Sequence, residues 1–313
     1  MIKLNKLKLL GKIGFKALKT NTKHLRTLSS RTEILEPVKL SYATYEDTKI
    51  DENEMLPPLV VLHGLFGSKS NWASLCKAYQ QKLLPKRKIV AVDCRNHGDS
   101  PHSDSHSYGH IAVDLKDLLN HLNVEKIALM GHSMGGRAVM LFALKYPELV
   151  EKLIVVDISP VSSDKSLNTM PSILAALENA KLPDNIPSSQ ARANVDEQLS
   201  HTVKEKDVRA FLLTNLVQTS DKKYKWRINI PALMANFSNN IAKFPSINNM
   251  HYEGPTLFVS GEKSNYVKES DYPEIKKIFP NTQFNVIKES GHWVHSEKPK
   301  EFLDVTVNFL NDY

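Results

Sequence analysis

The chain has 313 residues, 41% hydrophobic and 24% charged, a balance that predicts one large globular α/β domain with an insertion or two small domains. No apolar run approaches the roughly 20 residues that span a bilayer, and the two cysteines, Cys76 and Cys94, are too few for a disulfide scaffold, which favours a reducing compartment. The net charge of +7 is confined to one end: residues 1–32 hold nine Lys or Arg and no acid, which leaves 32 basic and 34 acidic residues elsewhere and argues against nucleic-acid binding.

The basic N-terminal segment is the first element of the chain. Its apolar residues are interleaved with lysines, and an Arg-Thr-Leu-Ser stretch begins at Arg26. A basic, amphipathic, hydroxyl-bearing and acid-free composition is typical of a mitochondrial presequence, because such a segment binds anionic membranes and follows a negative-inside potential. We therefore expect residues 1–32 to be a presequence cleaved near Leu28, and the protein to be mitochondrial. A disordered basic tail and a membrane-surface anchor are the alternatives.

Beyond this segment, short apolar runs alternate with helical patterns. An early strand is predicted within residues 37–48, before a polar hairpin or loop. Further strands are predicted at 59–62, 88–92, 126–130 and 152–156, and helices at 70–84, 108–122 and 137–146. Because strands and helices alternate at the spacing of βαβ units, the sequence predicts a mostly parallel, doubly wound sheet.

The pattern changes after Pro160. Residues 161–250 contain no apolar strand-like run, only helical patterns at 170–180, 187–203, 206–218 and 231–242. Strands then return at 255–260 and 282–287, with helices at 270–279 and 298–311. A long insertion between two strands of one sheet is typical of a cap over an active site. The predicted organisation is therefore a core formed by residues 33–160 and 251–313 and a helical cap formed by residues 161–250.

A candidate nucleophile follows the predicted strand at 126–130. Residues 131–136 read Gly-His-Ser-Met-Gly-Gly and precede a predicted helix, which is the strand–turn–helix context of a G-x-S-x-G nucleophile elbow. Such a turn holds its serine in a strained backbone conformation, and side chains at Gly131 and Gly135 would collide across it. The sequence therefore predicts that Ser133 is a catalytic nucleophile.

Four further motifs accompany the elbow in a characteristic order. They are His63-Gly-Leu-Phe-Gly-Ser68, Asp93-Cys-Arg-Asn-His-Gly-Asp-Ser100, Asp157-Ile-Ser-Pro160 and Ser290-Gly-His-Trp-Val-His-Ser-Glu297. With these motifs the chain resembles the α/β-hydrolase superfamily over residues 37–313. Within that superfamily it is similar to the group that contains the mitochondrial yeast ethanol acetyltransferases and small abhydrolase-domain esterases. The resemblance implies an α/β-hydrolase fold with the cap inserted after the strand that ends at Asp157.

The resemblance also implies a Ser-Asp-His triad, with chain order serine, acid, histidine. His292 stands where the triad histidine belongs, and His295 is its competitor. Most members of the fold carry the acid in a Gly-x-x-Asp turn after the cap, but here that turn ends in Ser264. The ethanol acetyltransferase group uses an earlier acid, which corresponds to Asp157. Glu262 is the nearest alternative acid.

Asp271 is a more distant alternative acid. The oxyanion hole is expected to combine the backbone N–H groups of Leu65 and Met134, with His63 orienting the loop that carries Leu65. Three consecutive residues, Arg95, Asn96 and His97, are expected to pin the loop behind the elbow.

No metal or bound cofactor is expected. The histidines do not have the spacing of a metal-binding site; those considered are His97, His102, His106 and His110. The sequence also has neither a G-x-G-x-x-G motif nor a P-loop, so it does not indicate a nucleotide cofactor. Both cysteines are expected to be small buried hydrophobic residues. The expected partners are small molecules, and the oligomeric state is not predicted.

The leading hypothesis for the function is acyl transfer through an acyl-Ser133 intermediate. The resemblance implies acetyl-CoA as the acyl donor, as a substrate and not a cofactor, and ethanol as the acceptor, which gives ethyl acetate. Water that competes with ethanol would give esterase and thioesterase side activity. One alternative is a mitochondrial carboxylesterase or thioesterase that acts on small acyl esters. Another is a non-catalytic hydrolase-like binding protein.

Overall fold

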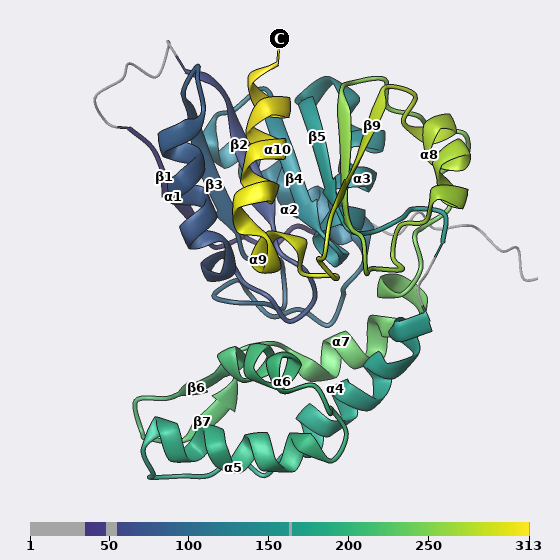
Figure 1. Ribbon diagram of the computed structural model, residues 1–313. Coiled ribbons are helices and arrows are strands. Elements are labelled where there is room, and N and C mark those ends of the chain that lie inside the picture. The colour runs from purple at the N-terminus through teal and green to yellow at the C-terminus, as the bar shows by residue number, and fades with distance from the viewer. Residues whose placement is uncertain (1–34, 48–54, 163–164, 313) are drawn as a thin grey trace, which may run out of the picture. The chain divides into compact units, whose positions relative to one another are not determined.

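In the part of the chain that the structure describes, the central sheet has seven strands in the order β1-β3-β2-β4-β5-β8-β9 (Figure 1). The computed structural model describes residues 35–47, 55–162 and 165–312, so the expected presequence lies outside the described residues. The strands are β1 (Tyr42–Tyr45), β2 (Leu56–Leu62), β3 (Arg87–Val92), β4 (Ile127–His132), β5 (Val150–Val156), β8 (Thr256–Gly261) and β9 (Thr282–Ile287). Only the edge strand β1 runs antiparallel to its neighbour, so the prediction of a mostly parallel sheet is confirmed.

Helices cover both faces of this sheet. The core helices are α1 (Ala73–Lys82), α2 (Tyr108–Leu122), α3 (Met134–Lys145), α8 (Tyr272–Ile278), α9 (Val294–Glu297) and α10 (Pro299–Asn311). Side chains alternate across each strand, so Leu59 and Val61 of β2 belong to one buried cluster with α1 and α10. Val60 and Leu62 belong to the opposite cluster with α2 and α3. This is the doubly wound α/β-hydrolase arrangement that the sequence predicts.

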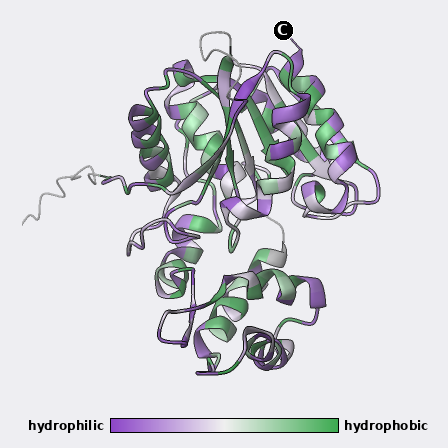
Figure 2. Ribbon diagram, turned by 90° about the vertical axis from the view of Figure 1, so that its left-hand side faces the viewer, coloured by the Kyte–Doolittle hydropathy of each residue, from purple (hydrophilic) through white to green (hydrophobic). Residues whose placement is uncertain are grey.

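The hydrophobic core explains why the buried strands read as continuous apolar runs. A strand that is covered by helices on both faces has no solvent side and needs apolar residues at every position. In Figure 2 hydrophobic residues accordingly dominate the central strands, whereas hydrophilic residues lie on the outer sides of the helices. Among the described residues, no helix is both long and apolar enough to cross a membrane.

The chain between β5 and β8 forms the cap. Its elements are α4 (Met170–Asn179), α5 (Ser188–Ser200), α6 (Lys206–Leu212), β6 (Leu216–Gln218), β7 (Tyr224–Trp226) and α7 (Ile230–Asn236). Because β5 and β8 are neighbours in the sheet, the insertion leaves and re-enters the core at adjacent strands (Figure 1).

One expectation about the cap was wrong. Residues 161–250 are not all helical, because β6 and β7 pair as a short antiparallel hairpin, and the helix predicted at 206–218 ends at Leu212. Strands of three residues are too short to display an alternating pattern. Leu212, Leu213 and Leu216 are also spaced as residues on one helix face would be.

The turn between β4 and α3 is packed too closely for side chains. A Cβ atom on Gly131 would lie 2.3 Å from the carbonyl oxygen of Gly135, and one on Gly135 would lie 2.5 Å from the carbonyl oxygen of His63. Ser133, between these glycines, has a φ of 53°. The predicted requirement for glycine at both positions is therefore confirmed, and the second contact brings this turn against the loop that follows β2.

Candidate active site

Ser133 stands at the carboxyl end of β4, where the turn into α3 presents its hydroxyl to a cavity. Its Oγ lies 3.0 Å from Nε2 of His292, which comes from the loop after β9. The other ring nitrogen of His292, Nδ1, lies 2.7 Å from Oδ2 of Asp157 at the end of β5. The carboxylate can only accept, so Nδ1 carries the proton and Nε2 accepts the hydrogen bond from the Ser133 hydroxyl.

Asp157 is completely buried, and three donors surround its carboxylate. Oδ1 accepts a hydrogen bond from the backbone N–H of Gly261 at 3.1 Å. Oδ2 accepts one from His292 and a second, at 2.5 Å, from the hydroxyl of Ser264. A buried carboxylate is tolerated only when such partners replace water. The sequence singles out position 264 only because it carries serine and not an acid. In the structure this serine donates directly to the carboxylate of Asp157.

The alternative acids and base have other partners. Glu262 is exposed and pairs with Lys288 at 2.7 Å, and Asp271 accepts a hydrogen bond from the Ser162 hydroxyl at 2.5 Å. The ring of His295 stacks on Trp72 at 4.4 Å between centroids. Burial lowers the pKa of His295 to about 3. Of the weighed candidates, only Asp157 and His292 form the hydrogen-bonded series with Ser133.

His292 is also held by its backbone and by its ring. Nε2–H of His132, the residue before the nucleophile, donates to the backbone oxygen of His292 at 2.9 Å. The ring of Tyr266 stacks on the His292 ring at 3.9 Å between centroids. Burial lowers the pKa of His132 well below its ordinary value, which keeps that ring neutral. Sequence reasoning missed His132 and Tyr266, although His132 lies inside the elbow motif.

The two expected oxyanion donors, Leu65 and Met134, belong to the two turns that meet at Gly135. Met134 is the first residue of α3, where a helix leaves its N–H without an internal partner. Leu65 lies in a tight turn closed by the N–H of Gly67, which donates to the carbonyl oxygen of Gly64 at 3.0 Å. Met134 follows the nucleophile directly, and the loop that carries Leu65 begins at His63, whose carbonyl oxygen packs against Gly135 of the same turn. The two expected donors therefore lie on neighbouring turns.

Two buried histidines hold the Leu65 loop. His63 donates from Nδ1 to Gly64 O at 2.8 Å and accepts at Nε2 from the N–H of Cys94 at 3.0 Å. His97 accepts at Nε2 from the N–H of Phe66 at 3.2 Å. Burial lowers the pKa of both imidazoles, so each remains neutral and keeps one acceptor nitrogen. The geometry agrees with the expected orienting role of His63.

The neighbouring residues Arg95 and Asn96 secure the segment that carries His97. Arg95 forms a buried bidentate ion pair with Asp114 of α2, with both N–O distances at 2.7 Å. Asn96 accepts a hydrogen bond at its side-chain oxygen from the N–H of Ser103 at 2.7 Å. Of the three expected loop-pinning residues, His97 alone bonds to the loop that carries Leu65.

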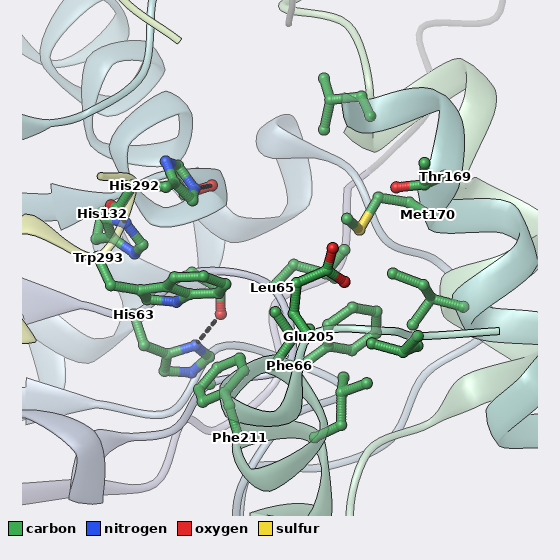
Figure 3. Close-up of a pocket in the computed structure, with 18 of the residues that line it drawn as sticks. His63, Leu65, Phe66, His132, Thr169, Met170, Glu205, Phe211, His292 and Trp293 are labelled. Carbon is green, nitrogen blue, oxygen red and sulfur yellow. Dashed lines mark hydrogen bonds between the residues drawn. The ribbon is translucent and has the colours of Figure 1, made fainter. Parts of the chain in front are cut away.

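A cavity of about 770 Å³ opens between the core and the cap at Ser133. Figure 3 shows its two sides: His63, Leu65, Phe66, His132, His292 and Trp293 from the core, and Thr169, Met170, Glu205 and Phe211 from the cap. The cap side is lined by apolar residues together with polar and charged ones, among them Lys204 and Glu205. Two apolar residues of the cap, Phe211 and Leu212, line the cavity. Leu216 and Leu233 are instead buried in the packing of the cap.

Metal and thiol chemistry have no candidate groups in the described parts of the chain. No cluster of three or more His, Cys, Asp or Glu residues there is placed to hold a metal ion. Burial raises the pKa of the Cys76 thiol to about 12, and it also raises the pKa of the Cys94 thiol. Both cysteines are buried and free, as expected. The hydrogen-bonded series from Ser133 through His292 to Asp157 is suited to nucleophilic attack by an activated serine.

Several known proteins are similar to this chain. A family model described as alpha/beta hydrolase fold matches residues 57–299. The chain is 45% identical over 276 residues to the sn-1-specific diacylglycerol lipase ABHD11 of Mus musculus, with 88% of this chain and 86% of the relative covered. It is 32% identical over 291 residues to a Saccharomyces cerevisiae protein named "Probable alcohol acetyltransferase", with 88% and 84% covered. A solved marine microorganism esterase is 34% identical and superposes with a TM-score of 0.77 over 87% of this chain and 99% of that structure.

The assignment of the acid can be tested by Asp157→Asn. The amide preserves the shape of the side chain but favours the wrong tautomer of His292, so we expect kcat for a chromogenic ester to fall about ten-thousandfold. Glu262→Gln is the matched control and should stay within about twofold of the parent, because Glu262 faces solvent. Near-normal activity of Asp157→Asn together with loss in Glu262→Gln would contradict the assignment.

The buried imidazole of His295 should make stability depend on pH. It stays neutral in the folded protein down to a pKa of about 3, but it takes up a proton near pH 6.5 when the chain unfolds. The free energy of unfolding that the neutral His295 contributes is therefore fully present above pH 6.5 and is lost as the pH falls from 6.5 toward 3. His295→Phe, which keeps a ring against Trp72, should reduce the slope of unfolding free energy between pH 4 and 6 by about 1.4 kcal/mol per pH unit.

Urea unfolding at several pH values measures that slope. The control is His201→Gln, which removes an imidazole that remains exposed to solvent in the fold, and its slope should match that of the parent. Equal slopes for the parent and His295→Phe would mean that His295 does not stay neutral in the fold.

Proposed function

The chain belongs to the α/β-hydrolase family and is an enzyme of the esterase and lipase type, and we propose that it cleaves neutral glycerol esters of long acyl chains through an acyl-Ser133 intermediate. The observation that carries this proposal is the hydrogen-bonded series from Ser133 through His292 to Asp157, beside a large apolar cavity. The proposed catalytic residues are Ser133, His292 and Asp157, with the backbone N–H groups of Leu65 and Met134 as the oxyanion hole.

The first half-reaction forms the acyl-enzyme. Oγ of Ser133 attacks the ester carbonyl carbon while Nε2 of His292 takes the hydroxyl proton. The negative charge that develops on the carbonyl oxygen is stabilised by the N–H groups of Leu65 and Met134. Asp157 stabilises the imidazolium and keeps Nδ1 protonated throughout. The tetrahedral intermediate collapses when His292 gives its proton to the leaving alcohol oxygen, and the acyl group remains on Ser133.

The second half-reaction releases the acyl group. A water molecule takes the place of the departed alcohol, and Nε2 of His292 removes one of its protons as the oxygen attacks the acyl carbon. The same two N–H groups stabilise the second oxyanion. Return of the proton to Ser133 Oγ regenerates the serine and frees a carboxylic acid.

The cavity supports a long acyl group. Its volume of about 770 Å³ lies in the upper part of the range of ligand pockets, and an acetyl group would leave most of it empty. The apolar side chains Met170, Phe211 and Leu212 on the cap side would remove an acyl chain from water (Figure 3). The 45% identity to the mouse diacylglycerol lipase supports the same substrate class.

Glu205 supports a neutral rather than an anionic substrate. Its carboxylate extends from the cap into the cavity (Figure 3). It would repel a phosphate placed beside it, and the neighbouring Lys204, which also lines the cavity, would offset part of that repulsion. It would also accept a hydrogen bond from a free hydroxyl group of a partially acylated glycerol. We propose that Glu205 selects such hydroxylated esters.

The second candidate function is synthesis of ethyl acetate from acetyl-CoA and ethanol, with thioesterase activity as a side reaction. It is favoured by the 32% identity to the yeast protein named as a probable alcohol acetyltransferase. In the first half-reaction the thioester of acetyl-CoA would acylate Ser133, and the CoA sulfur would leave with the proton from His292. In the second half-reaction ethanol would replace water and release ethyl acetate. The size of the cavity and the charge of Glu205 favour the glycerol ester. A purely binding role has no need of the complete hydrogen-bonded series at Ser133.

A series of esters with one alcohol and increasing acyl length tests the proposed substrate class. From the acetyl to the octanoyl ester we expect kcat/KM to rise at least about tenfold, because each buried methylene contributes roughly 0.8 kcal/mol. Release of fatty acid from a diacylglycerol should exceed formation of ethyl acetate from acetyl-CoA and ethanol, measured by gas chromatography. Ser133→Ala should abolish every one of these reactions.

Glu205→Gln provides the matched variant, because it removes the charge but keeps the size of the side chain. It should raise octanoyl-CoA hydrolysis relative to hydrolysis of the neutral octanoyl ester. Ethyl acetate as the main product at high ethanol would instead support the second candidate. Full activity of Ser133→Ala would reject both enzymatic proposals.

We also propose that residues 1–32 direct the protein to mitochondria and that its mature form begins near Ser29. Deletion of residues 1–28 should give an active enzyme outside mitochondria, because all the motifs of the site lie beyond residue 37. Cell fractionation combined with an esterase assay measures both outcomes. A fusion of residues 1–32 to a fluorescent protein is the control, and a truncated protein that still enters mitochondria would place the signal elsewhere.

A further inference from the structure

One side chain of the cap is bonded directly to the loop that carries the oxyanion donor Leu65. Asn215 follows α6 and is 2% exposed. Its side-chain nitrogen, Nδ2, donates to the backbone oxygen of Phe66 at 2.8 Å and to that of Leu212 at 3.3 Å. The backbone oxygen of Asn215 accepts from the N–H of Arg227 at 2.8 Å, which fixes it to the end of the cap hairpin.

Phe66 needs this support. It follows Leu65 directly and has a φ of 65°, in the left-handed region that favours glycine. A bulky residue stays in such a conformation only where its surroundings impose it. Its N–H is held from the core by His97, and its carbonyl is held from the cap by Asn215. The peptide groups on both sides of Phe66 are thus fixed from two directions. The second of these peptides also supplies the N–H of Gly67, which donates to the carbonyl oxygen of Gly64 at 3.0 Å, and the peptide of that carbonyl carries the Leu65 N–H.

The core partner of Phe66 also lies against the cap. His97 follows Asn96, whose backbone oxygen accepts from the N–H of Asn229 at 3.0 Å and whose side-chain oxygen accepts from Asn229 Nδ2 at 3.0 Å. Asn229 belongs to the cap and precedes α7. The carbonyl of Phe66 is therefore bonded directly to the cap, through Asn215. Its N–H is bonded to His97, whose neighbour Asn96 is bonded to the cap through Asn229.

We propose that Asn215 is a positioning residue through which the docked cap completes the oxyanion hole. With the cap in place, Asn215 fixes the carbonyl of Phe66 and thereby aims the N–H of Leu65 at the developing oxyanion. Without that bond the loop relaxes from its strained conformation and the donor turns away. The cap is then part of the machinery that accelerates the chemical step, besides being a wall of the acyl cavity. This inference rests on the proposed acyl-Ser133 mechanism.

Two variants of Asn215 test the proposal. Asn215→Ala removes the donor, and Asn215→Asp keeps the shape of the side chain but presents an oxygen where the donor stood. For each we expect kcat to fall about tenfold or more while KM changes less than about twofold, because an oxyanion donor acts on the transition state and not on the bound ester. The same factor should appear for acetyl and octanoyl esters, since the carbonyl is common to both.

A transition-state analogue gives a second readout. A trifluoromethyl ketone adds to the serine and forms an oxyanion in the same position as that of the intermediate. Its inhibition constant should rise by the factor by which kcat falls. A merely structural contact would not produce this match.

Asn236 offers a matched control elsewhere on the cap. Its Nδ2 donates to the core carbonyl of Asp104 at 2.8 Å and to its own helix at Ala232 O, also at 2.8 Å. Asn236→Ala thus removes the same kind of bridge between cap and core, but not at the oxyanion loop. We expect its kcat and its inhibition constant to stay within about twofold of the parent. Thermal unfolding of all three variants reports any loss of stability.

The outcomes separate the inference from the proposed function. If the parent is active, Ser133→Ala is inactive and folded Asn215→Asp keeps the kcat of the parent, the positioning role is wrong and the mechanism stands. The positioning role is also wrong if Asn236→Ala loses kcat as much as Asn215→Ala does, or if only the octanoyl ester is affected. If Ser133→Ala keeps full activity, the proposed mechanism itself fails.

Discussion

The candidate site depends on the close approach of two turns, one after β2 and one after β4. A single methyl group on Gly135 would lie 2.5 Å from the His63 carbonyl oxygen, so the contact permits no side chain. This closeness sets the loop that carries Leu65 against the turn that carries Ser133 and Met134. It also places both turns in strain, because Ser133 and Phe66 each have a positive φ. The surrounding histidines and the cap hold these turns in conformations that the local sequence disfavours.

The position of the acid follows from the order of the strands. Because β5 and β8 are neighbours, a carboxylate at the end of either strand lies near the histidine loop after β9. Asp157 takes that role from β5, and Ser264, in the turn after β8, donates a hydrogen bond to it at 2.5 Å. A carboxylate at position 264 would instead face Asp157 across a buried site, where like charges repel strongly. Acid and hydroxyl therefore form a compatible pair, which explains why the usual acidic position is occupied by serine.

The parts of this site that the sequence predicts are those with a local pattern. Ser133 and Asp157 each follow an apolar run that is recognisable as a strand, and His292 comes shortly after the strand pattern at 282–287. The carboxyl ends of strands in a parallel sheet meet at one edge. Asn215 and Phe66 are 149 positions apart, and nothing near either residue indicates their contact. The hairpin of β6 and β7 and the stacking of Tyr266 on His292 likewise arise from tertiary packing. Nothing in the sequence around Glu205 indicates that it lines the cavity, because its position there depends on how the cap packs on the core.

The turn of the cap from Leu212 to Asn215 affects both substrate binding and the rate of the chemical step. Leu212 lines the acyl cavity, and its backbone oxygen accepts a hydrogen bond from Asn215, which also holds Phe66. The surface that would remove an acyl chain from water is therefore directly continuous with the contact that fixes the oxyanion loop. A cap that docks only loosely would lose its apolar wall and its hold on Phe66 together. Exclusion of water and stabilisation of the oxyanion thus depend on one structural event, the seating of the cap on the core.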